Sequence, residues 1–274
     1  MARTMTEALL AMKSDIRFGF GRNWTKFLSV IDHQRLALAE QSLKTMLDVQ
    51  DLKGKTFVDV GCGSGLFSLA ASRLGARVYS FDYDGASVAC TEELKRRYCP
   101  FNTEWHITTG SALDSAYLQS LGQFDVVYSW GVLHHTGEMW QAMENVHRLV
   151  RSNGKLAIAI YNSQGWTSRY WKWVKRSYNT NSVLKLGMIL FHLPYLIGAR
   201  WVIRMITHRR ALERGMSLWY DMIDWLGGYP FEVAKPEEVY AFYHSKGFVL
   251  SHLKTCGGRH GCNEFVLLKG ALQQ

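Results

Sequence analysis

The pattern of apolar and polar residues divides the chain into segments of different periodicity. Residues 1–50 have helical spacing, and the run HQRLALAEQSLKTML places on one helical face Leu36, Ala39, Leu43, Met46 and Leu47. Short β-rich runs follow, with helical patterns in most of the gaps, at 56–61, 76–82, 104–110, 124–130 and 154–161. This alternation predicts a parallel sheet with helices on both faces.

A long segment over 162–230, rich in Trp, Tyr and Arg, interrupts the alternation and reads as mostly helical. The sheet resumes with a helix that begins at Pro236 and with strands over 248–255 and 263–270. Because the turn between these two strands is so short, they must be antiparallel. We therefore expect four regions, namely an N-terminal helical lid (1–50), a ligand-binding core (51–161), an inserted helical substrate cap (162–230) and the end of the core sheet (231–274).

Composition places the chain among globular proteins. With 274 residues and 47% hydrophobic content, it can bury the core of one large domain or of a domain with an inserted cap. Its beginning carries Glu7 and Asp15 and has no cleavage site after an apolar run, so we expect no secretion signal. Five widely spread cysteines without a CxxC pair fit reduced cytosolic thiols better than a disulfide frame.

The positive charge is concentrated in one segment. The net charge is +9, and the segment from Trp166 to Arg214 holds ten Lys and Arg residues against one acid, Glu213. Such an excess raises nucleic acid as a partner. However, these cations alternate with bulky aliphatic residues, and no separate RNA-binding module is visible, so nucleic acid is the less favoured partner.

The same segment raises the question of membranes. The run Leu186–Ala199 is uncharged for fourteen residues, which is too short to span a bilayer, since spanning takes about 20 apolar residues. It could lie on a bilayer surface as an interfacial helix. The alternative is a cap that buries its apolar face on the rest of the chain or on a second subunit.

Glycines lie at every second position between the first strand and the next helix, at Gly61, Gly63 and Gly65. Glycine allows positive φ and lets a ligand approach the main chain, while the following helix N-terminus offers free N–H groups, so a nucleotide-like ligand is implied. The dinucleotide fingerprint would need a glycine at Leu66, which argues against a pyrophosphate clamp. Asp82 ends the second strand, where its carboxylate could accept both hydroxyls of an adenosine ribose.

The motif Asp59-Val60-Gly61-Cys62-Gly63-Ser64-Gly65 resembles the first motif of the class I S-adenosylmethionine (SAM) dependent methyltransferases, (D/E)-x-G-x-G-x-G. The resemblance covers roughly 55–161 and the terminal strand pair. It implies a doubly wound α/β fold with a seven-stranded sheet in the order 3-2-1-4-5-7-6, the last strand antiparallel. It also implies SAM as cofactor, S-adenosylhomocysteine (SAH) as product, and a ribose-binding role for Asp82.

The resemblance carries over further cofactor contacts. Many members have an acid after the glycine that follows the third strand, where this chain has Ser111, so Ser111 or the backbone at Ala112 would meet the adenine. The residues implied to bind SAM are Asp59, Gly61, Cys62, Gly63, Gly65, Asp82, Tyr83, Ser111, Ala112, Ser129 and Trp130. The alternative is a tight strand-to-helix turn beside ordinary strand-end acids. The coincidence of glycines, acid and antiparallel ending favours SAM.

Residues after the fourth strand should lie over the SAM sulfur, because ligands of open α/β sheets bind outside the carboxyl ends of the strands. A hydroxyl or thiol acceptor benefits from a base, and His134 and His135 are the candidates. Small-molecule members often read V-L-x-H here, which aligns with His135. The alternative is that one imidazole packs under the cap or caps the helix that begins near Glu138.

Other side chains are candidates for the acceptor pocket. We expect Trp130, Trp140 and Tyr161 to line it, with aromatic core filling as the alternative for each. Arg259 and His260 could hold an anionic substrate, although a solvated turn explains them equally well. Cys256 and Cys262 lie on either side of that turn, but two thiols and one imidazole leave a tetrahedral shell incomplete, so we predict no metal site.

Two aromatic segments could form lids. Near the N-terminus, Phe18, Arg22 and Trp24 could fold over SAM or simply pack as helix residues. A Gly-Gly break lies in a second segment where a lid could hinge, among Asp221, Asp224, Trp225, Tyr229 and Phe231.

Together these patterns predict a cytosolic SAM-dependent methyltransferase that acts on a small or lipid-linked metabolite, at an oxygen atom. In its core and in its insertion it resembles the ubiquinone-biosynthesis O-methyltransferases. The alternatives are an RNA (tRNA) methyltransferase, a thiol or nitrogen acceptor, and a catalytically silent SAM-binding partner. Peripheral membrane contact and a homodimer stay open.

Overall fold

The computed structural model describes residues 17–21, 24, 28, 31–198, 218–257 and 261–270. The chain divides into two compact units. The larger unit consists of residues 20–164 and 232–274, and the smaller unit consists of residues 1–19 and 165–231. That 1–50 acts as a lid and that 162–230 acts as a substrate cap stay predictions.

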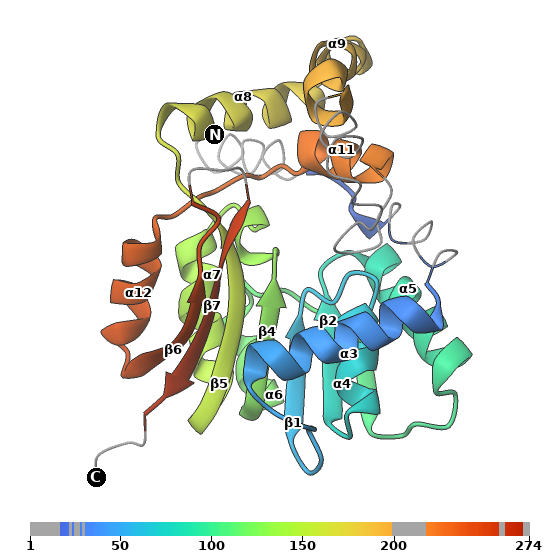
Figure 1. The fold of residues 1–274 in the computed structure, drawn as a ribbon, viewed down its shortest axis with the longest axis vertical. Helices are drawn as coiled ribbons and strands as arrows, with labels where there is room; N and C mark the ends of the chain where they lie inside the picture. The colour runs from blue at the N-terminus through green and yellow to red at the C-terminus, as the bar shows by residue number, and fades with distance from the viewer. Residues whose placement is uncertain are drawn as a thin grey trace, which may run out of the picture. The chain divides into compact units, whose positions relative to one another are not determined.

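One sheet of seven strands runs through the larger unit in the order β3-β2-β1-β4-β5-β7-β6 (Figure 1). Its strands are β1 Thr56–Val60, β2 Arg77–Asp82, β3 Trp105–Thr109, β4 Phe124–Trp130, β5 Val150–Tyr161, β6 Phe248–Lys254 and β7 Cys262–Lys269. β7 pairs antiparallel with both of its neighbours, while β1 to β5 pair in parallel. The predicted fold class and strand order are confirmed.

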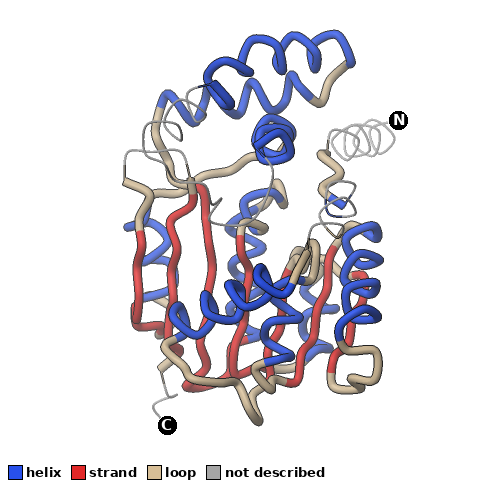
Figure 2. The backbone as a smooth tube through the Cα atoms, turned by 45° about the vertical axis from the view of Figure 1, so that its right-hand side comes forward, coloured by secondary structure: helices blue, strands red, loops and turns tan. Residues whose placement is uncertain are grey.

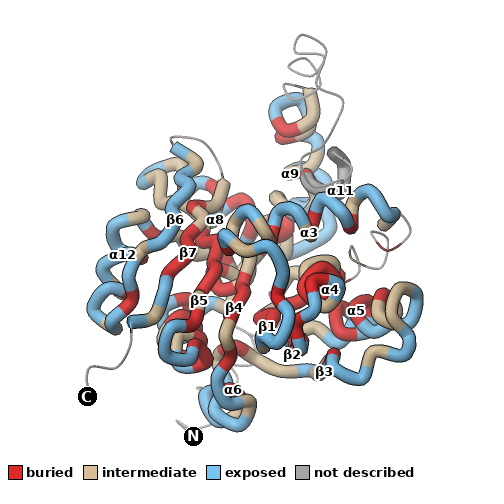
Figure 3. The backbone as a smooth tube through the Cα atoms, turned by 60° about the horizontal axis from the view of Figure 1, so that its bottom comes forward, coloured by how far each residue is buried: buried red, intermediate tan, exposed pale blue. Residues whose placement is uncertain are grey.

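Helices cover both faces of this sheet (Figures 1 and 2). One face is covered by α3 His33–Leu47, α4 Leu66–Arg73 and α5 Gly85–Tyr98. The other is covered by α6 Ser115–Leu121, α7 Met139–Val146 and α12 Pro236–His244. Buried residues accordingly concentrate along the strands and on the inner helix faces (Figure 3). The sheet therefore separates two apolar layers.

Helix α3 illustrates how the sequence specifies these elements locally. The Asp32 side chain caps its first turn by accepting a hydrogen bond from the backbone N–H of Arg35 at 2.8 Å. Four of the five residues predicted on its inner face are buried, namely Leu36, Ala39, Leu43 and Leu47. The helix packs on α4 within the larger unit.

The strand register sets the place of the candidate site. Val60 at the end of β1 lies beside Phe81 of β2, and Asp82 lies beside Thr109 at the end of β3. Because β1 to β4 are parallel, the loops that follow them leave the sheet at the same edge. The motifs identified from the sequence follow β1, β2, β3 and β4, so the fold brings them together.

The smaller unit is helical, with α8 Trp166–Tyr178, α9 Ser182–Leu193, the short helix η3 Pro194–Gly198 and α11 Leu218–Gly227. Lys175 of α8 is buried within it. Its Nζ donates to the carbonyl of Trp225 and lies 4.3 Å from the ring centre of Trp225 and 4.9 Å from that of Phe231. Within the described part of the chain, no helix combines the length and apolarity that crossing a membrane requires.

Candidate functional site

The glycine loop links β1 to α4 with left-handed backbone at each of its glycines. The φ angles are +79° at Gly61, +55° at Gly63 and +76° at Gly65. A side chain at Gly61 is excluded by lack of space as well as by the backbone angle, because a Cβ there would lie 2.4 Å from Val132 Cγ1. Only glycine combines these angles with so close an approach, so the path of this loop depends on its glycines.

Asp82 contacts this loop directly. Its Oδ2 accepts a hydrogen bond from the backbone N–H of Gly63 at 2.9 Å, and its Oδ1 accepts one from that of Asp84 at 2.9 Å. Burial raises the pKa of Asp82, while these hydrogen bonds from Asp84 and Gly63 oppose the rise. The glycine loop and the acid predicted to bind the ribose are therefore joined by a hydrogen bond.

Asp59 and Cys62 are buried at the same loop. Asp59 Oδ2 accepts from the hydroxyl of Ser68 at 2.5 Å, and Ser68 in turn accepts from Ser80 at 2.8 Å. Burial raises the pKa of Asp59 to about 7; the Ser68 hydrogen bond opposes this, and the charge of Asp82 adds to it. Burial likewise raises the pKa of the Cys62 thiol well above its usual range, so the sulfur stays protonated. Asp59 is thus hydrogen-bonded inside the protein to Ser68, and its contact with a cofactor stays a prediction.

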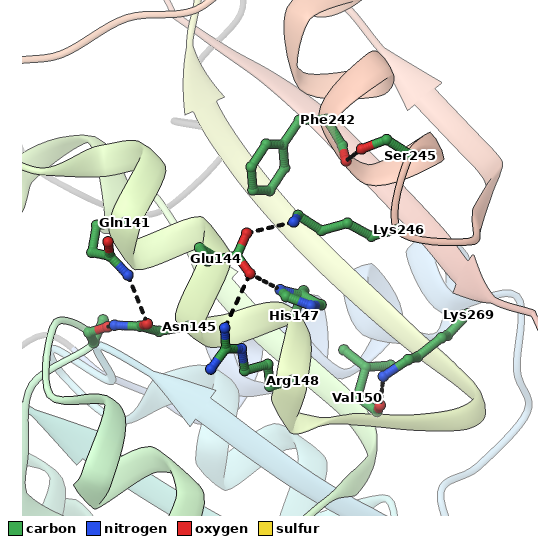
Figure 4. A network of polar contacts seen from close by, with 11 residues as sticks. Gln141, Glu144, Asn145, His147, Arg148, Val150, Phe242, Ser245, Lys246 and Lys269 are labelled. Atoms are coloured by element: carbon green, nitrogen blue, oxygen red, sulfur yellow. Dashed lines mark hydrogen bonds and ion pairs between the residues drawn. The ribbon is translucent and has the colours of Figure 1, made fainter. Parts of the chain in front are cut away.

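The loop after β3 is held from α7. The carbonyl of Ala112 accepts a hydrogen bond from Asn145 Nδ2 at 3.0 Å. Asn145 Oδ1 in turn accepts from Gln141 Nε2 at 3.0 Å, as Figure 4 shows. Asn145 is buried, so its amide is committed to these contacts. The hydroxyl of Ser111 accepts from the N–H of Leu113 at 3.1 Å, which closes a tight turn. Sequence reasoning missed Asn145, whose importance appears only when α7 packs beside this loop.

The remaining predicted cofactor residues differ in exposure. Ser129 is buried and donates its hydroxyl to the carbonyl of Val60 at 3.1 Å, which joins β4 to the start of the glycine loop. The ring of Trp130 stacks on that of Tyr128 at 5.6 Å. Tyr83, which follows Asp82, is exposed. Contacts of these residues with a cofactor stay predictions.

The two histidines after β4 lie on the short helix η1 Leu133–His135 in different surroundings. His134 is 0% exposed, and its Nδ1 accepts a hydrogen bond from the backbone N–H of Tyr161 at 3.3 Å. An imidazole that accepts through Nδ1 carries its proton on Nε2. His134 is therefore a packed neutral ring that fixes the end of β5.

His135 is only half-buried and lies among aromatic rings. Its ring centre is 5.0 Å from that of Phe20, 5.5 Å from that of Tyr161 and 4.5 Å from that of His134. Of the two imidazoles, His135 is the one with a surface that a small molecule could meet. Phe20 belongs to the aromatic N-terminal segment but was not among the lid residues predicted from the sequence.

Glu232 is a second residue that sequence reasoning missed. Its backbone N–H donates to the carbonyl of His134 at 3.0 Å, and its carboxylate accepts from the N–H of Met139 at 2.9 Å. A carboxylate at a helix N-terminus is favourable, because it satisfies a free N–H group and faces the positive end of the helix dipole. Glu232 therefore caps α7 in place of the imidazole considered above, and it holds the histidine turn at the same time.

The segment around Phe20 lies along the candidate site within the larger unit. The N–H of Gly21 donates to Asp84 Oδ2 at 2.9 Å. A Cβ on Gly63 would lie 3.0 Å from the indole Nε1 of Trp24, so this indole lies against the glycine loop. Whether Trp24 covers a cofactor stays a prediction. Arg22 lies outside the described residues, and Phe18 belongs to the smaller unit.

The predicted acceptor-lining residues are not all brought together. Tyr161 joins the histidine cluster, whereas the ring of Trp140 packs on Phe242 of α12 at 5.4 Å. Arg259 and His260 lie outside the described residues. Over the ranges that the structure describes, no group of three His, Cys, Asp or Glu side chains is arranged to hold a metal ion.

Comparison with known proteins concerns mainly this core. Residues 58–158 match the family described as Methyltransferase domain. The ubiquinone biosynthesis O-methyltransferase of Pseudomonas paraeruginosa is 31% identical over 111 residues, which are 40% of this chain and 46% of that protein. The ribosomal protein L11 methyltransferase of Legionella pneumophila is 39% identical over 72 residues, or 26% of this chain and 25% of that protein. The chain thus spans less than half of the length of either relative.

Among solved structures, the magnesium protoporphyrin IX methyltransferase (ChlM) from Synechocystis PCC 6803 with bound SAH is similar over 91% of this chain and 94% of its own. The TM-score is 0.55 and the sequence identity is 12%. An O-methyltransferase family protein from Burkholderia thailandensis is similar over 87% of this chain and 58% of its own. Its TM-score is 0.55 and its sequence identity is 10%. At these identities the likeness concerns the fold.

Proposed function

We propose that this protein, whose core belongs to the class I SAM-dependent methyltransferases, transfers a methyl group from SAM to a hydroxyl of a small-molecule or lipid-linked acceptor. The observation that carries the proposal is the 2.9 Å hydrogen bond from Gly63 N–H to Asp82 Oδ2. It joins bare main chain and a carboxylate at the edge where open α/β sheets bind their ligands.

The residues present fit this cofactor. Each oxygen of Asp82 accepts one backbone N–H in the structure, and a carboxylate oxygen has a second lone pair for a ribose hydroxyl. Gly61 and Gly63 give the loop a left-handed path that brings it against Val132 and Trp24, where a Cβ would not fit. The turn of Ser111 and Ala112 would meet the adenine. When bound, SAM supplies an electrophilic methyl group on a sulfonium sulfur.

The protein's own part in the transfer would be alignment, exclusion of water and removal of one proton. We assign proton removal to His135, because it is half-buried and because histidine is the residue type most often used as a general base. An imidazole nitrogen of His135 would take up the acceptor proton, and the methyl group that replaces this proton on the acceptor oxygen would be supplied by SAM, which would leave as SAH. His134 acts as a positioning residue, because its ring is buried against Tyr161.

Calorimetric titration with SAM tests the cofactor assignment. We expect saturable binding near micromolar concentrations, and a loss of at least about tenfold in affinity in Asp82→Ala, since a hydrogen-bonded charged partner is removed. His135→Ala should bind SAM within about twofold of the wild type but lose most of the methyl transfer, typically about 100-fold for a general base. His252→Ala, an exposed histidine of β6, is the matched control. Equal turnover in the His135 variant would refute the base assignment.

Labelled SAM added to a lysate identifies the acceptor class. Label in the small-molecule or lipid fraction supports the proposal, and mass-spectrometric fragmentation of the labelled product then distinguishes an oxygen acceptor from sulfur or nitrogen. Label in RNA or protein would replace the proposal, and RNA is included because the segment from Trp166 to Arg214 is strongly basic. Saturable SAM binding without label in any fraction would indicate a catalytically silent SAM-binding protein.

A further inference from the structure

Helix α8 exposes an aromatic and cationic face. Trp166 is 76% exposed and Trp173 is 57% exposed, and the exposed Arg169, Tyr170 and Arg176 lie on the same helical face. Arg169 lies 5.1 Å from the ring centre of Trp166, so cation and aromatic ring are paired on the surface. Large aromatic side chains at helical spacing on an exposed face indicate an interaction surface.

The opposite face of α8 is packed. The exposed aromatic residues therefore belong to a helix that already has a buried face. Its buried residues are Ser168, Trp171, Val174, Lys175 and Tyr178. The helix therefore has an inner face that stabilises the smaller unit and an outer face that is available for a partner.

Helix α9 is apolar around most of its circumference. Only His192 among its 12 residues is buried. Val183 is 81% exposed and Phe191 is 74% exposed, and Leu186 and Leu190 are exposed as well. A helix with apolar residues on all sides is normally buried in a protein or a membrane. Its exposure here indicates that something covers it.

The two helices pack on each other as one helical hairpin. The hydroxyl of Tyr170 and Nε2 of His192 are 2.8 Å apart, and the rings of Trp171 and His192 are 5.3 Å apart. Near the turn, Lys185 Nζ lies 5.1 Å from the ring centre of Tyr178. These contacts join the aromatic face of α8 to the aliphatic α9, and we call residues 166–195 the α8–α9 hairpin.

Charge decides which partner suits this hairpin. The sequence contains no Asp or Glu between Glu144 and Glu213, so the hairpin itself carries no acidic residue. Its exposed cations are Arg169, Lys172, Arg176 and Lys185. Apolar side chains next to Lys and Arg, with no acid among them, match the interface of an anionic bilayer.

We propose that the α8–α9 hairpin docks on an anionic lipid bilayer, with its exposed aromatic and aliphatic side chains in the interfacial layer and its cations on the headgroup phosphates. A second copy of the chain fits less well, because a twofold contact would bring the same cations together without an acid to pair them. Nucleic acid would meet the cations and the aromatic rings but would leave exposed residues such as Val183, Leu186 and Phe191 without a partner. The proposal does not depend on the methyl acceptor.

Sedimentation of the full chain with vesicles tests the proposal. The wild type should bind vesicles of equal parts phosphatidylglycerol and phosphatidylcholine and bind pure phosphatidylcholine far more weakly. Arg169→Gln and Arg176→Gln should each weaken anionic binding about fivefold, and this loss should shrink at high salt because exposed charges are screened. Trp173→Ser with Phe191→Ser should weaken it by about tenfold or more. Phe101→Ser, at a 94% exposed aromatic of the larger unit, is the matched control.

The changed side chains are exposed, so these variants should fold, and unchanged thermal melting and SAM binding verify this. Failure to bind either kind of vesicle overturns the proposal, as does an equal loss in Phe101→Ser. A dimer in sedimentation velocity that Trp173→Ser with Phe191→Ser dissociates, without vesicle binding by the wild type, would assign the surface to a second copy. Salt-sensitive RNA binding that outcompetes the vesicles would assign it to nucleic acid. None of these outcomes changes the methyl-transfer test.

Discussion

The buried carboxyl of Asp59 should make the stability of this protein depend on pH. Burial raises its pKa to about 7. The hydrogen bond from Ser68 lowers the pKa, and the charge of Asp82 raises it further. The side chain is buried on β1, one residue before the strand ends, so water does not screen its charge. Asp59→Asn keeps the shape and the acceptor oxygen for Ser68 but removes the titration, so it isolates the effect of this one group.

The direction follows from the protons bound in each state. Between pH 4 and pH 7 the unfolded chain has released the Asp59 proton, since its ordinary pKa is 3.8, whereas the folded chain keeps it up to about pH 7. The folded state therefore binds more protons, and its stability falls as the pH rises through this window. The loss is about 1.4 kcal/mol for each pH unit, or about 3 kcal/mol from pH 5 to above pH 7.

Urea unfolding of the SAM-free wild type and of Asp59→Asn, at pH 5, 6, 7 and 8, measures this effect. The free energy of unfolding of the wild type, minus that of the variant, should fall by about 3 kcal/mol across the series, because other titrating groups are common to both proteins. Asp51→Asn, at an exposed carboxyl, is the control and should give a nearly flat difference.

A wild-type minus Asp59→Asn difference that stays constant with pH would refute the reasoning. It would mean that the carboxylate is hydrated or paired in solution. Ser68→Ala gives an independent check, because it removes the hydrogen bond that favours the charged form. In that variant the fall in stability should extend to higher pH.

Three other substitutions test the candidate site. Gly61→Ala should lower SAM affinity at least about tenfold, because the new Cβ would lie 2.4 Å from Val132 at a φ of +79°; Gly122→Ala, at +78° with open space, is the calorimetric control. Asn145→Leu should raise the SAM Kd several-fold with kcat at saturating SAM nearly unchanged, because it frees the loop after β3; an unchanged Kd would contradict this. Glu232→Ala should lower kcat about tenfold at constant SAM Kd by releasing the histidine turn, with rescue by Glu232→Gln in steady-state assays.

The strands and the glycine loop were predictable because their signals are local. β4 Phe124–Trp130 begins and ends where the sequence predicts, and α12 begins at Pro236 as predicted. β5 begins at Val150, four residues before its predicted start at Gly154. Asn153, with a φ of +61°, interrupts the regular pattern there, and pairing of Val150 with Phe124 extends the strand.

The exposure of the histidines could not be predicted, because adjacent residues of the same type give no signal of their packing. Both rings lie near Tyr161, but His134 is buried whereas His135 is half-buried. Trp140 likewise packs on Phe242, a residue that lies about a hundred positions later in the chain. Such contacts depend on chain segments that are far apart in sequence.

The strand alternation, the glycine turn after β1 and the acid at the end of β2 could be inferred from the sequence, because these signals act within a few residues. The order of the strands followed only from the resemblance to the class I methyltransferases, because periodicity does not say which strands lie side by side. The commitment of Asp59 to Ser68, the hold of Asn145 on Ala112 and the cap that Glu232 places on α7 arise only in the folded chain. Each of these contacts forms because distant elements pack together and remove water from a polar group. Burying such a group without a hydrogen-bond partner costs free energy, so the fold supplies a partner.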